Sequence, residues 1–346
     1  AVFHVNGPVL VLAGAGSGKT TAMIHRIVQM IHFGDGWVQA NASITKEDAA
    51  YLKDYIADKQ PADLERLCSI LAVQPIQPWH ILAITFTNKA ANELRSRLLQ
   101  AIGEECASML HASTFQSACV RILRRSISKL GYDSNFTIYD TDDSQRLMKS
   151  CIADADVSEK QFPPRAVLTE ISLAKDRMCS PEYFCIEAGS DYRKMVIGKL
   201  YKEYQNRLKS ANALDFDDLI YKTVELLESF PEELEYYQNR FRYIMVDEYQ
   251  DTNHAQFRLV QLLSQKHQNL CVVGDDDQSI YRFRGATIEN ILNFEKQFQN
   301  AVAIRLEQNY RSTKTILEAA NDVIAHNAGR KEKTLWTDLE DGKKII

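Results

Sequence analysis

The sequence predicts an α/β protein in which a parallel β-sheet is flanked by helices and interrupted by an inserted all-helical subdomain. Three observations lead to this prediction. Short runs rich in Val, Ile and Leu recur along the chain, and continuous apolar runs are typical of strands that are covered on both faces. Segments with helical periodicity separate these runs, the order expected of a parallel sheet. Two longer stretches carry helical patterns almost throughout, which indicates insertions into the sheet domain.

Five segments are expected to form the buried strands. They are residues 8–14 (PVLVLAG), 80–87 (HILAITFT), 243–248 (YIMVDE), 270–275 (LCVVGD) and 302–308 (VAIRLEQ). Helices are expected between them, at 88–102 and 252–265 among others. Strands that alternate with helices in this way favour a doubly wound sheet over a sandwich or a helical bundle.

Two insertions are expected in this sheet domain. Residues 31–79 contain two helical patterns, at 45–59 and 62–71, bounded by FGDG and QPIQP, and they predict a helical hairpin. Residues 126–212 are longer and helical throughout, with no strand signal beyond FTIYD, and they predict a separate helical subdomain. The hairpin has no function that we can assign from its sequence.

Composition excludes several classes of protein. The 346 residues are 45% apolar and 25% charged, as in ordinary globular proteins, and no apolar stretch approaches the roughly 18 residues of a membrane span. We therefore expect no membrane partner. Seven scattered cysteines without a CxxC pair indicate reduced thiols in the cytoplasm rather than disulfides or a zinc site. A formal net charge of −5 does not favour a uniformly basic surface, although a basic groove remains compatible with it.

The segment VLVLAGAGSGKTT, residues 9–21, predicts a phosphate-binding loop. Glycines cost backbone entropy and add nothing to a core, so three of them before a lysine indicate that a bare backbone is needed. A tight loop between a buried strand and a helix directs N–H groups and the positive helix end at an anion. Lys19 is expected to reach the β- and γ-phosphates of ATP, and Thr20 to bind Mg²⁺. The predicted loop consists of Ala13, Gly14, Ala15, Gly16, Ser17, Gly18, Lys19, Thr20 and Thr21.

Ala13 stands where the common pattern of this loop has its first glycine. A small residue is expected to suffice there. The alternative is a glycine-rich turn that carries an exposed lysine. The order of strand, loop, Lys-Thr and helix favours the phosphate-binding loop.

Hydrolysis needs a carboxylate partner, and the segment YIMVDEYQD supplies two. Asp247 and Glu248 follow an expected strand directly. Asp247 is expected to hold Mg²⁺ together with Thr20, and Glu248 to polarise the attacking water. We expect both carboxylates to face Lys19 from the adjacent strand end. Acidic residues that merely keep a strand end soluble are the alternative.

The segment VVGDDDQSIYRFRGA, residues 272–286, predicts a link between nucleotide and nucleic acid. It ends a third expected strand in acidic residues followed by Gln278, which could contact a γ-phosphate. Tyr281, Phe283 and Arg284 then combine aromatic and basic character. Aromatic rings stack on unpaired bases, and arginine neutralises the backbone. A surface loop with buried aromatic residues is the alternative.

With these segments placed, the sequence resembles the UvrD/PcrA/Rep group of superfamily 1 DNA helicases. The resemblance rests on seven blocks in the family's order: AGAGSGKT, ITFTNKAANELRSRL, ASTFQSACVRILR, LDFDDLI, VDEYQDTN, GDDDQSIYRFRGA and LEQNYRST. It implies two RecA-like domains that bind ATP between them and step along single-stranded DNA from 3′ to 5′, unwinding duplex DNA in repair or replication. Repair or replication proteins are the implied partners.

The resemblance also implies residue roles. In NYRST, Tyr310 is similar to the residue that stacks on adenine, and Arg311 to the arginine that meets the γ-phosphate, while Gln278 resembles the γ-phosphate sensor. A cation that arrives across a cleft stabilises transition-state charge only when the domains close. The residues that resemble the DNA-facing set are Phe86, Asn88, Thr114, Phe115, Tyr281, Phe283 and Arg284. Phe216 in LDFDDLI is either a further DNA contact or a core residue.

The sequence departs from the family's pattern in several places. The glutamine that precedes the phosphate loop in the family is absent, Thr21 replaces a common arginine, and Phe283 replaces a common tryptophan. We expect residues 1–125 and 213–290 to form the first RecA-like domain, 126–212 the helical insertion, and 291–346 the start of a truncated second domain. We interpret the chain as an N-terminal fragment that is poorly active alone.

Two other functions stay open at this point. The chain could be the motor part of a helicase–nuclease similar to RecB and AddA, in which the nuclease domain lies downstream. It could also be a non-catalytic DNA-binding protein on a helicase-like fold. The presence of Lys19, Asp247, Glu248 and Gln278 argues against the latter.

Overall fold

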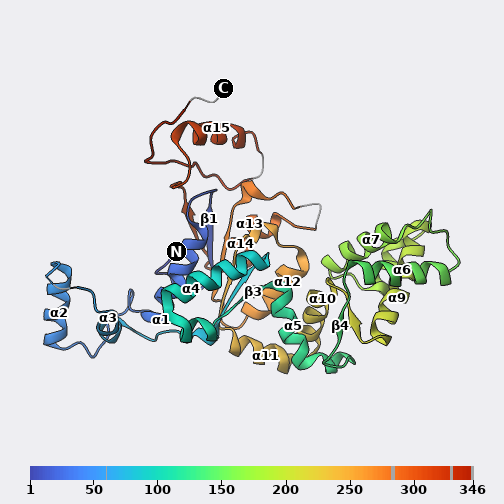
Figure 1. Ribbon diagram of the computed structural model, residues 1–346, viewed down its shortest axis with the longest axis horizontal. Coiled ribbons are helices and arrows are strands. Elements are labelled where there is room, and N and C mark those ends of the chain that lie inside the picture. Colours follow the sequence, from blue (N-terminus) through green and yellow to red (C-terminus); the bar gives the residue numbers. More distant parts are fainter. Residues whose placement is uncertain (60, 282–284, 328–329, 344–346) are drawn as a thin grey trace.

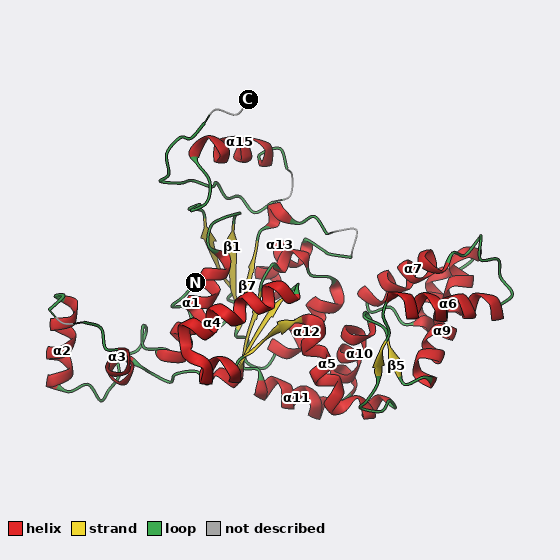
Figure 2. Ribbon diagram, in the orientation of Figure 1, coloured by secondary structure: helices red, strands yellow, loops and turns green. Residues whose placement is uncertain are grey.

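The protein is built around one six-stranded parallel sheet. The computed structural model describes residues 1–59, 61–281, 285–327 and 330–343. The strands lie in the order β3-β2-β6-β7-β1-β8, and every pairing between them is parallel. Their bounds are β1 Val9–Ala13, β2 Ile81–Thr85, β3 His111–Thr114, β6 Tyr243–Val246, β7 Leu270–Gly274 and β8 Val302–Leu306. The predicted fold class is therefore confirmed (Figure 2).

The five predicted strands all form, and they form where the apolar runs lie. β1, β2 and β7 are buried at every position, as expected for strands covered on both faces. The edge strand β3 was not predicted. Its sequence, HAST, has only one apolar residue, so hydrophobic periodicity gave no signal there.

Helices cover both faces of the sheet (Figure 1). Alternate strand residues point to opposite faces, and Val9, Val11 and Ala13 pack in one hydrophobic core with helices α1 Lys19–His32 and α4 Asn88–Met109. Leu10 and Leu12 point to the other core. That core contains residues of α5 Phe115–Ser126, α10 Asp218–Ser229, α11 Pro231–Arg240, α12 His254–Ser264, α13 Glu289–Leu292 and α14 Phe294–Gln297.

A helical subdomain with its own core extends from the sheet domain. Its helices are α6 Thr141–Asp154, α7 Pro164–Asp176, α8 Pro181–Ala188 and α9 Tyr192–Ser210, and their apolar faces meet around buried residues that include Tyr201 and Tyr204. Two short strands, β4 Thr137–Ile138 and β5 Ala213–Leu214, pair where the chain leaves and re-enters the sheet domain. β5 directly follows the predicted end of the insertion at residue 212, whereas β4 begins 11 residues after the predicted start at 126. Ile127, Tyr132 and Phe136 pack instead in the core of the sheet domain.

The predicted hairpin forms two helices that project from the other side of the sheet domain (Figure 1). They are α2 Lys46–Ile56, which begins with a capping box at Thr45, and α3 Leu64–Leu71, capped by Asp63. Their shared core is small, with Tyr51, Leu67 and Ile70 as its buried residues. At the base of the hairpin, Trp37 stacks on Phe3 at a ring distance of 4.2 Å.

The sheet extends past the domain boundary predicted between residues 290 and 291. β8 pairs with β1 along its whole length, from Val9 with Val302 to Ala13 with Leu306, so this strand belongs to the first sheet. The predicted boundary is wrong because β8 extends the first sheet by backbone pairing at its edge, and the sequence does not reveal such pairing. The chain then leaves the sheet and forms α15 Lys314–Ile324 (Figure 1). None of the described helices is both long and apolar enough to cross a membrane.

Candidate active site

Three polar loops meet at the carboxyl edge of the sheet, after β1, β6 and β7. The structure corrects one expectation here, because β7 lies between β1 and β6. The strand that carries Asp247 and Glu248 is therefore not adjacent to the strand that precedes Lys19. The carboxyl ends of parallel strands share one edge, and the long side chains bridge the intervening strand.

The loop between β1 and α1 adopts the left-handed backbone that its glycines permit. Gly16 has φ 70° and Gly18 has φ 84°, a region that disfavours side chains. Space is also limiting, because a Cβ on Gly16 would lie 2.7 Å from Asn309 Nδ2. The buried Ser17 hydroxyl donates to the carbonyl of Gly14 at 2.8 Å. α1 then begins at Lys19, which places the positive end of a 14-residue helix at this loop.

The side chains that follow this loop meet the carboxylates after β6. Lys19 Nζ lies 3.1 Å from Glu248 Oε2, and the Thr20 hydroxyl lies 3.5 Å from Asp247 Oδ2. Lys19 is largely buried, with 12% of its side chain exposed, whereas Glu248 is 39% exposed. Glu248 has a left-handed backbone, φ 49°, an uncommon conformation for a residue with a side chain. Strain of this kind is concentrated at functional sites.

Asp247 is a buried carboxylate that lacks a full positive partner. Burial raises its pKa to about 6, and the charge of Glu248 acts in the same direction. The backbone N–H of Glu248, Lys19 and the Thr20 hydroxyl oppose this shift. A hydroxyl and a carboxylate oxygen side by side are the hard ligands that Mg²⁺ prefers. The residues present therefore fit a magnesium site, and a divalent cation would offset the charge that burial disfavours.

Gln250 joins the β6 and β7 loops, although sequence analysis did not select it. Its amide donates to Glu248 Oε2 at 2.9 Å, and its carbonyl oxygen accepts the backbone N–H of Asp275 at 2.9 Å. Gln278 follows on the β7 loop and donates to Asp275 Oδ2. The predicted phosphate sensor is thus connected to the predicted water-activating carboxylate through Gln250 and Asp275.

Asn309 is a second residue that sequence analysis missed. It is 2% exposed, donates to the carbonyl of Ala15 at 2.6 Å, and accepts the backbone N–H groups of Arg311 and Ser312. The N–H of Tyr310 also donates to the carbonyl of Gly16 at 3.0 Å. These bonds hold the NYRST segment against the glycine-rich loop between β1 and α1. The Tyr310 side chain is 68% exposed beside that loop.

The acidic cluster Asp275, Asp276 and Asp277 has carboxylate oxygens close enough together to suggest a metal site. The ammonium of Lys333 occupies the centre of this cluster, at 2.8, 2.6 and 2.6 Å from the three carboxylates. Arg330 adds two bonds of 2.8 Å to Asp277. Two cationic side chains that follow α15 therefore offset most of the negative charge of this cluster.

The predicted DNA-facing residues divide by exposure. Asn88 is exposed and Phe86 half-buried, Phe216 is 57% exposed and Tyr281 38%. Exposure excludes the core role considered for Phe216. Phe115 differs from the expectation, because only 1% of it is exposed and Phe86 packs edge-on against its ring at 5.6 Å. Its apolar ring belongs to the core, and Thr114 caps α5 through its hydroxyl. Phe283 and Arg284 lie outside the described residues.

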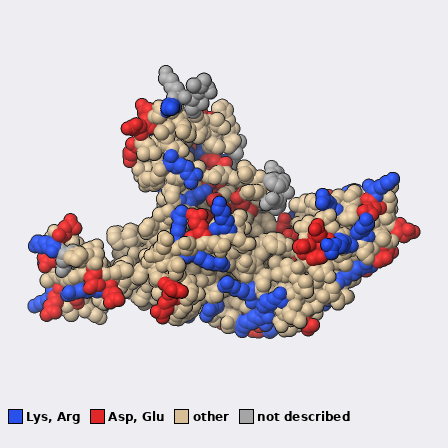
Figure 3. Space-filling view, viewed as in Figure 1, with Lys and Arg blue, Asp and Glu red and all other residues tan. Residues whose placement is uncertain are grey.

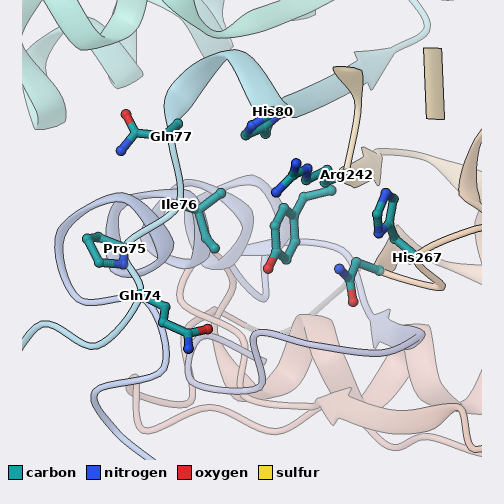
Figure 4. A pocket seen from close by; sticks show the side chains of 9 residues that line it. Gln74, Pro75, Ile76, Gln77, His80, Arg242 and His267 are labelled. Atoms are coloured by element: carbon teal, nitrogen blue, oxygen red, sulfur yellow. The ribbon is translucent and has the colours of Figure 1, made fainter. Parts of the chain in front are cut away.

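A pocket of about 320 Å³ opens at the opposite edge of the sheet (Figure 4). Arg242 lies between His80 and His267 on its wall, and the segment that follows α3 contributes Gln74 and Gln77. None of the predicted site residues lines this pocket. The predicted nucleotide site therefore lies at the carboxyl edge of the sheet, away from this pocket.

Comparison with known proteins gives matches over nearly the whole chain. The model of the UvrD/REP helicase N-terminal domain matches residues 1–41 and 64–299, and that of the UvrD-like helicase C-terminal domain matches residues 304–346. Residues 42–63, which include α2, fall between the matched segments.

Curated relatives match the chain at high identity. The ATP-dependent DNA helicase PcrA of Bacillus subtilis is 47% identical over 345 residues, which are 100% of this chain and 41% of the relative. PcrA of Staphylococcus epidermidis (strain RP62A) is 47% identical and PcrA of Staphylococcus aureus (strain Mu50) 46%, each with 42% of its length covered. The chain therefore spans about two fifths of the length of these relatives.

Proposed function

This chain belongs to the UvrD/REP helicase family, and from that premise we propose that it forms the ATP-binding part of a DNA helicase motor. The motor would couple ATP hydrolysis to 3′-to-5′ movement on single-stranded DNA and to unwinding of duplex DNA. Its setting would be DNA repair or replication in the cytoplasm, with proteins of those processes as partners. One observation carries the proposal: Lys19 and Thr20 meet Glu248 and Asp247 at 3.1 and 3.5 Å.

The geometry supports distinct roles for these residues. Backbone N–H groups of the loop and the start of α1 would bind the phosphates of ATP, with Lys19 exchanging its bond to Glu248 for the β- and γ-phosphates. Thr20 and Asp247 would hold Mg²⁺, which supplies charge neutralisation when bound. Glu248, once released by Lys19, would orient the attacking water and accept its proton.

The hydrogen-bonded connection through Gln250 supports coupling between hydrolysis and DNA. Gln278 is three residues before Tyr281 on the same loop. A change at the γ-phosphate would reach this loop through Glu248, Gln250 and Asp275, which are joined by bonds of 2.9 Å. Phe86, Asn88, Phe216 and Tyr281 are the described residues whose exposure supports a DNA-contacting role. Arg311 would add positive charge at the γ-phosphate when the two motor domains close.

A substitution in the full-length protein tests this function. Lys19→Ala should abolish the ATP hydrolysis that single-stranded DNA stimulates, because the ammonium that holds the phosphates is lost. Turnover is measured at saturating Mg²⁺ with and without single-stranded DNA.

Lys46→Ala provides the matched control, since this lysine lies on α2, outside the matched segments of the family. The control should retain normal turnover. Stimulated turnover that survives Lys19→Ala would contradict the proposal. Binding of DNA without any turnover by the unaltered protein would favour the non-catalytic alternative.

A further inference from the structure

A second pocket lies beside β3, which is the outermost strand on one side of the sheet. The loop between β1 and α1 lies toward the other side of the sheet, at the carboxyl ends of the strands. The volume of the pocket is about 250 Å³. Polar groups on its wall come from three elements: His111 and Ser113 on β3, Arg121 on α5, and Arg240 at the end of α11. We call it the arginine–histidine pocket. No role in nucleotide binding or hydrolysis follows from these residues.

Two guanidinium groups converge on one imidazole in this pocket. Arg121 Nη1 lies 3.1 Å from His111 Nδ1, and Arg240 Nη2 lies 3.1 Å from His111 Nε2. Arginine is only a donor, whereas a neutral imidazole has one N–H and one acceptor nitrogen. Only one of the two contacts can therefore be a hydrogen bond. The other guanidinium faces an N–H group.

Protonation of the imidazole would make both ring nitrogens donors and would worsen this mismatch. Burial lowers the pKa of His111 to about 4, and Arg240 and Arg121 act in the same direction. His111 is thus neutral at physiological pH, and the two guanidinium groups retain an uncompensated charge beside it. The cluster has a fixed positive charge and one guanidinium donor that the ring cannot accept.

The neighbouring carboxylates do not neutralise this charge. Glu233 pairs with Arg125 and Lys129, and Glu232 pairs with Lys129. Arg125 itself lies over the ring of Tyr236 at 3.4 Å. In the part of the chain that the structure describes, neither Arg121 nor Arg240 forms an ion pair with a carboxylate. α5 contributes Arg121, Arg124 and Arg125 to the surface around this pocket, and Lys and Arg side chains gather there beside acidic ones (Figure 3).

A buried hydroxyl in the same pocket has an unused hydrogen-bonding capacity. Ser113 is 1% exposed, and its Oγ has no partner among the described residues. A buried hydroxyl without a partner costs free energy, so an unmatched group of this kind indicates a ligand. The remaining wall is apolar and aromatic, with Phe241 edge-on to His111 at 5.2 Å. Such a wall lowers the local polarity and strengthens the attraction of an anion to the cations.

We propose that the arginine–histidine pocket binds a phosphoryl oxyanion, with Arg121 and Arg240 as its charged ligands and Ser113 as a donor. The oxygens of a tetrahedral phosphoryl group can accept hydrogen bonds from both guanidinium groups. A guanidinium can donate two parallel hydrogen bonds to two such oxygens. The His111 N–H adds one more donor and resolves the conflict at the imidazole. The phosphoryl group could belong to a small phosphorylated molecule or to a nucleic-acid backbone, and the experiment separates these sources.

The binding test uses inorganic phosphate as the probe. Every sample carries Lys19→Ala, so that the loop before α1 contributes little to the measured phosphate binding and contributes equally in all variants. Isothermal titration with sodium phosphate is compared with sodium chloride at matched ionic strength. Arg240→Gln should weaken phosphate binding at least about tenfold, because one charge-assisted bond is lost.

Arg242→Gln is the matched control. Arg242 is an exposed arginine two residues away that lines the other pocket instead. This control should change phosphate affinity less than about twofold, as for a surface charge. Because Arg121 is exposed, Arg121→Gln serves as a second variant in case Arg240→Gln impairs folding, which circular dichroism would reveal.

Competition with DNA then identifies the source of the phosphoryl group. If single-stranded or duplex DNA displaces phosphate from the pocket, and Arg240→Gln weakens that displacement, the source is a nucleic-acid backbone. If DNA leaves phosphate binding unchanged, the source is a small phosphorylated molecule. Equal effects of Arg240→Gln and Arg242→Gln, or an absence of phosphate binding in the Lys19→Ala chain, would overturn the proposal. Neither result bears on whether Lys19 supports ATP hydrolysis.

Discussion

Two lysine–carboxylate clusters in this molecule use the same chemistry with opposite results. Lys19 meets Glu248 at the open edge of the sheet, where the carboxylate is 39% exposed. Lys175 on α7 lies 2.6 Å from Asp215 and 2.9 Å from Asp218, and its side chain is 1% exposed. The first cluster can exchange partners with solvent or ligand, whereas the second is enclosed between the helical subdomain and the sheet domain.

Hydrogen bonding separates the two clusters further. Tyr204 donates to Asp215 at 3.1 Å, Gln205 donates to Asp218 at 2.9 Å, and the backbone N–H groups of the two aspartates each bond to the other carboxylate. Burial alone would raise the pKa of Asp215, but Lys175 outweighs it and holds that pKa below its ordinary value. In the open cluster, burial and Glu248 prevail over Lys19 and raise the pKa of Asp247 to about 6. Asp218 resembles Asp247 in this respect, because burial and the charge of Asp215 raise its pKa to about 6 against the opposing effect of Lys175. The two clusters therefore differ in enclosure and in the hydrogen bonds around the lysine, not in complete compensation of charge.

The largest expected effect is therefore at the enclosed cluster. Lys175→Met should lower the free energy of unfolding by about 3–5 kcal/mol, because two buried carboxylates lose their cation. Urea denaturation followed by circular dichroism measures this difference. Lys149→Met is the control, since Lys149 is 65% exposed and pairs with Glu159 at 3.6 Å, and it should change stability by about 0–1 kcal/mol. Equal losses of unfolding free energy in the two variants would contradict a special structural role for the enclosed cluster.

A smaller effect, of opposite sign, is expected at Asp247. Its pKa of about 6 in the folded protein exceeds the ordinary 3.8, so the folded state binds the proton more tightly than the unfolded state. Stability from this group is fully present below pH 4 and is lost as the pH rises through 6. Asp247→Asn should therefore stabilise the metal-free protein by about 2–3 kcal/mol at pH 8 and by little at pH 4.

Urea denaturation of Asp247→Asn and the unaltered chain at both pH values, in the presence of EDTA, measures this difference. Asp215→Asn is the contrasting variant and should destabilise the protein at pH 8, because its pKa is shifted downward. A loss of stability at pH 8 in Asp247→Asn would show that the carboxylate is better compensated than its burial indicates.

The same comparison explains what the sequence could and could not predict. The apolar strands β1, β2, β6, β7 and β8 are local patterns, which is why the sequence predicted them. The glycine-rich loop and the acidic strand end are local patterns too, and the structure brings their side chains together at one edge of the sheet. The sequence did not predict the roles of Asn309 and Gln250, because both depend on backbone groups elsewhere in the chain. Asn309 and Ala15, for example, are separated by 294 residues. The only hint of a role for Gln250 in the sequence was its position in the segment VDEYQD, two residues after Glu248.

Burial was the other property that the sequence did not reveal. Phe115 and Phe216 both occur in blocks that resemble DNA-facing motifs, yet one is 1% exposed and the other 57%. Adjacent strands were also misjudged, because strand order depends on crossovers and β7 enters between β1 and β6. These properties arise from long-range packing, to which a single sequence gives only weak clues.

The smallest effect on stability is expected at Glu248, to which we assign a direct role in catalysis. Glu248→Gln removes an ion pair whose carboxylate is 39% exposed, so the free energy of unfolding should change by only about 0–1 kcal/mol. In the full-length protein the same substitution should lower kcat of DNA-stimulated ATP hydrolysis by about 10²–10⁴-fold, because the proton acceptor for the attacking water is lost. Urea denaturation and steady-state turnover measure the two quantities on one variant. A large loss of stability with normal turnover would make Glu248 a structural partner of Lys19, as Asp215 is of Lys175, and the two clusters would then differ only in exposure.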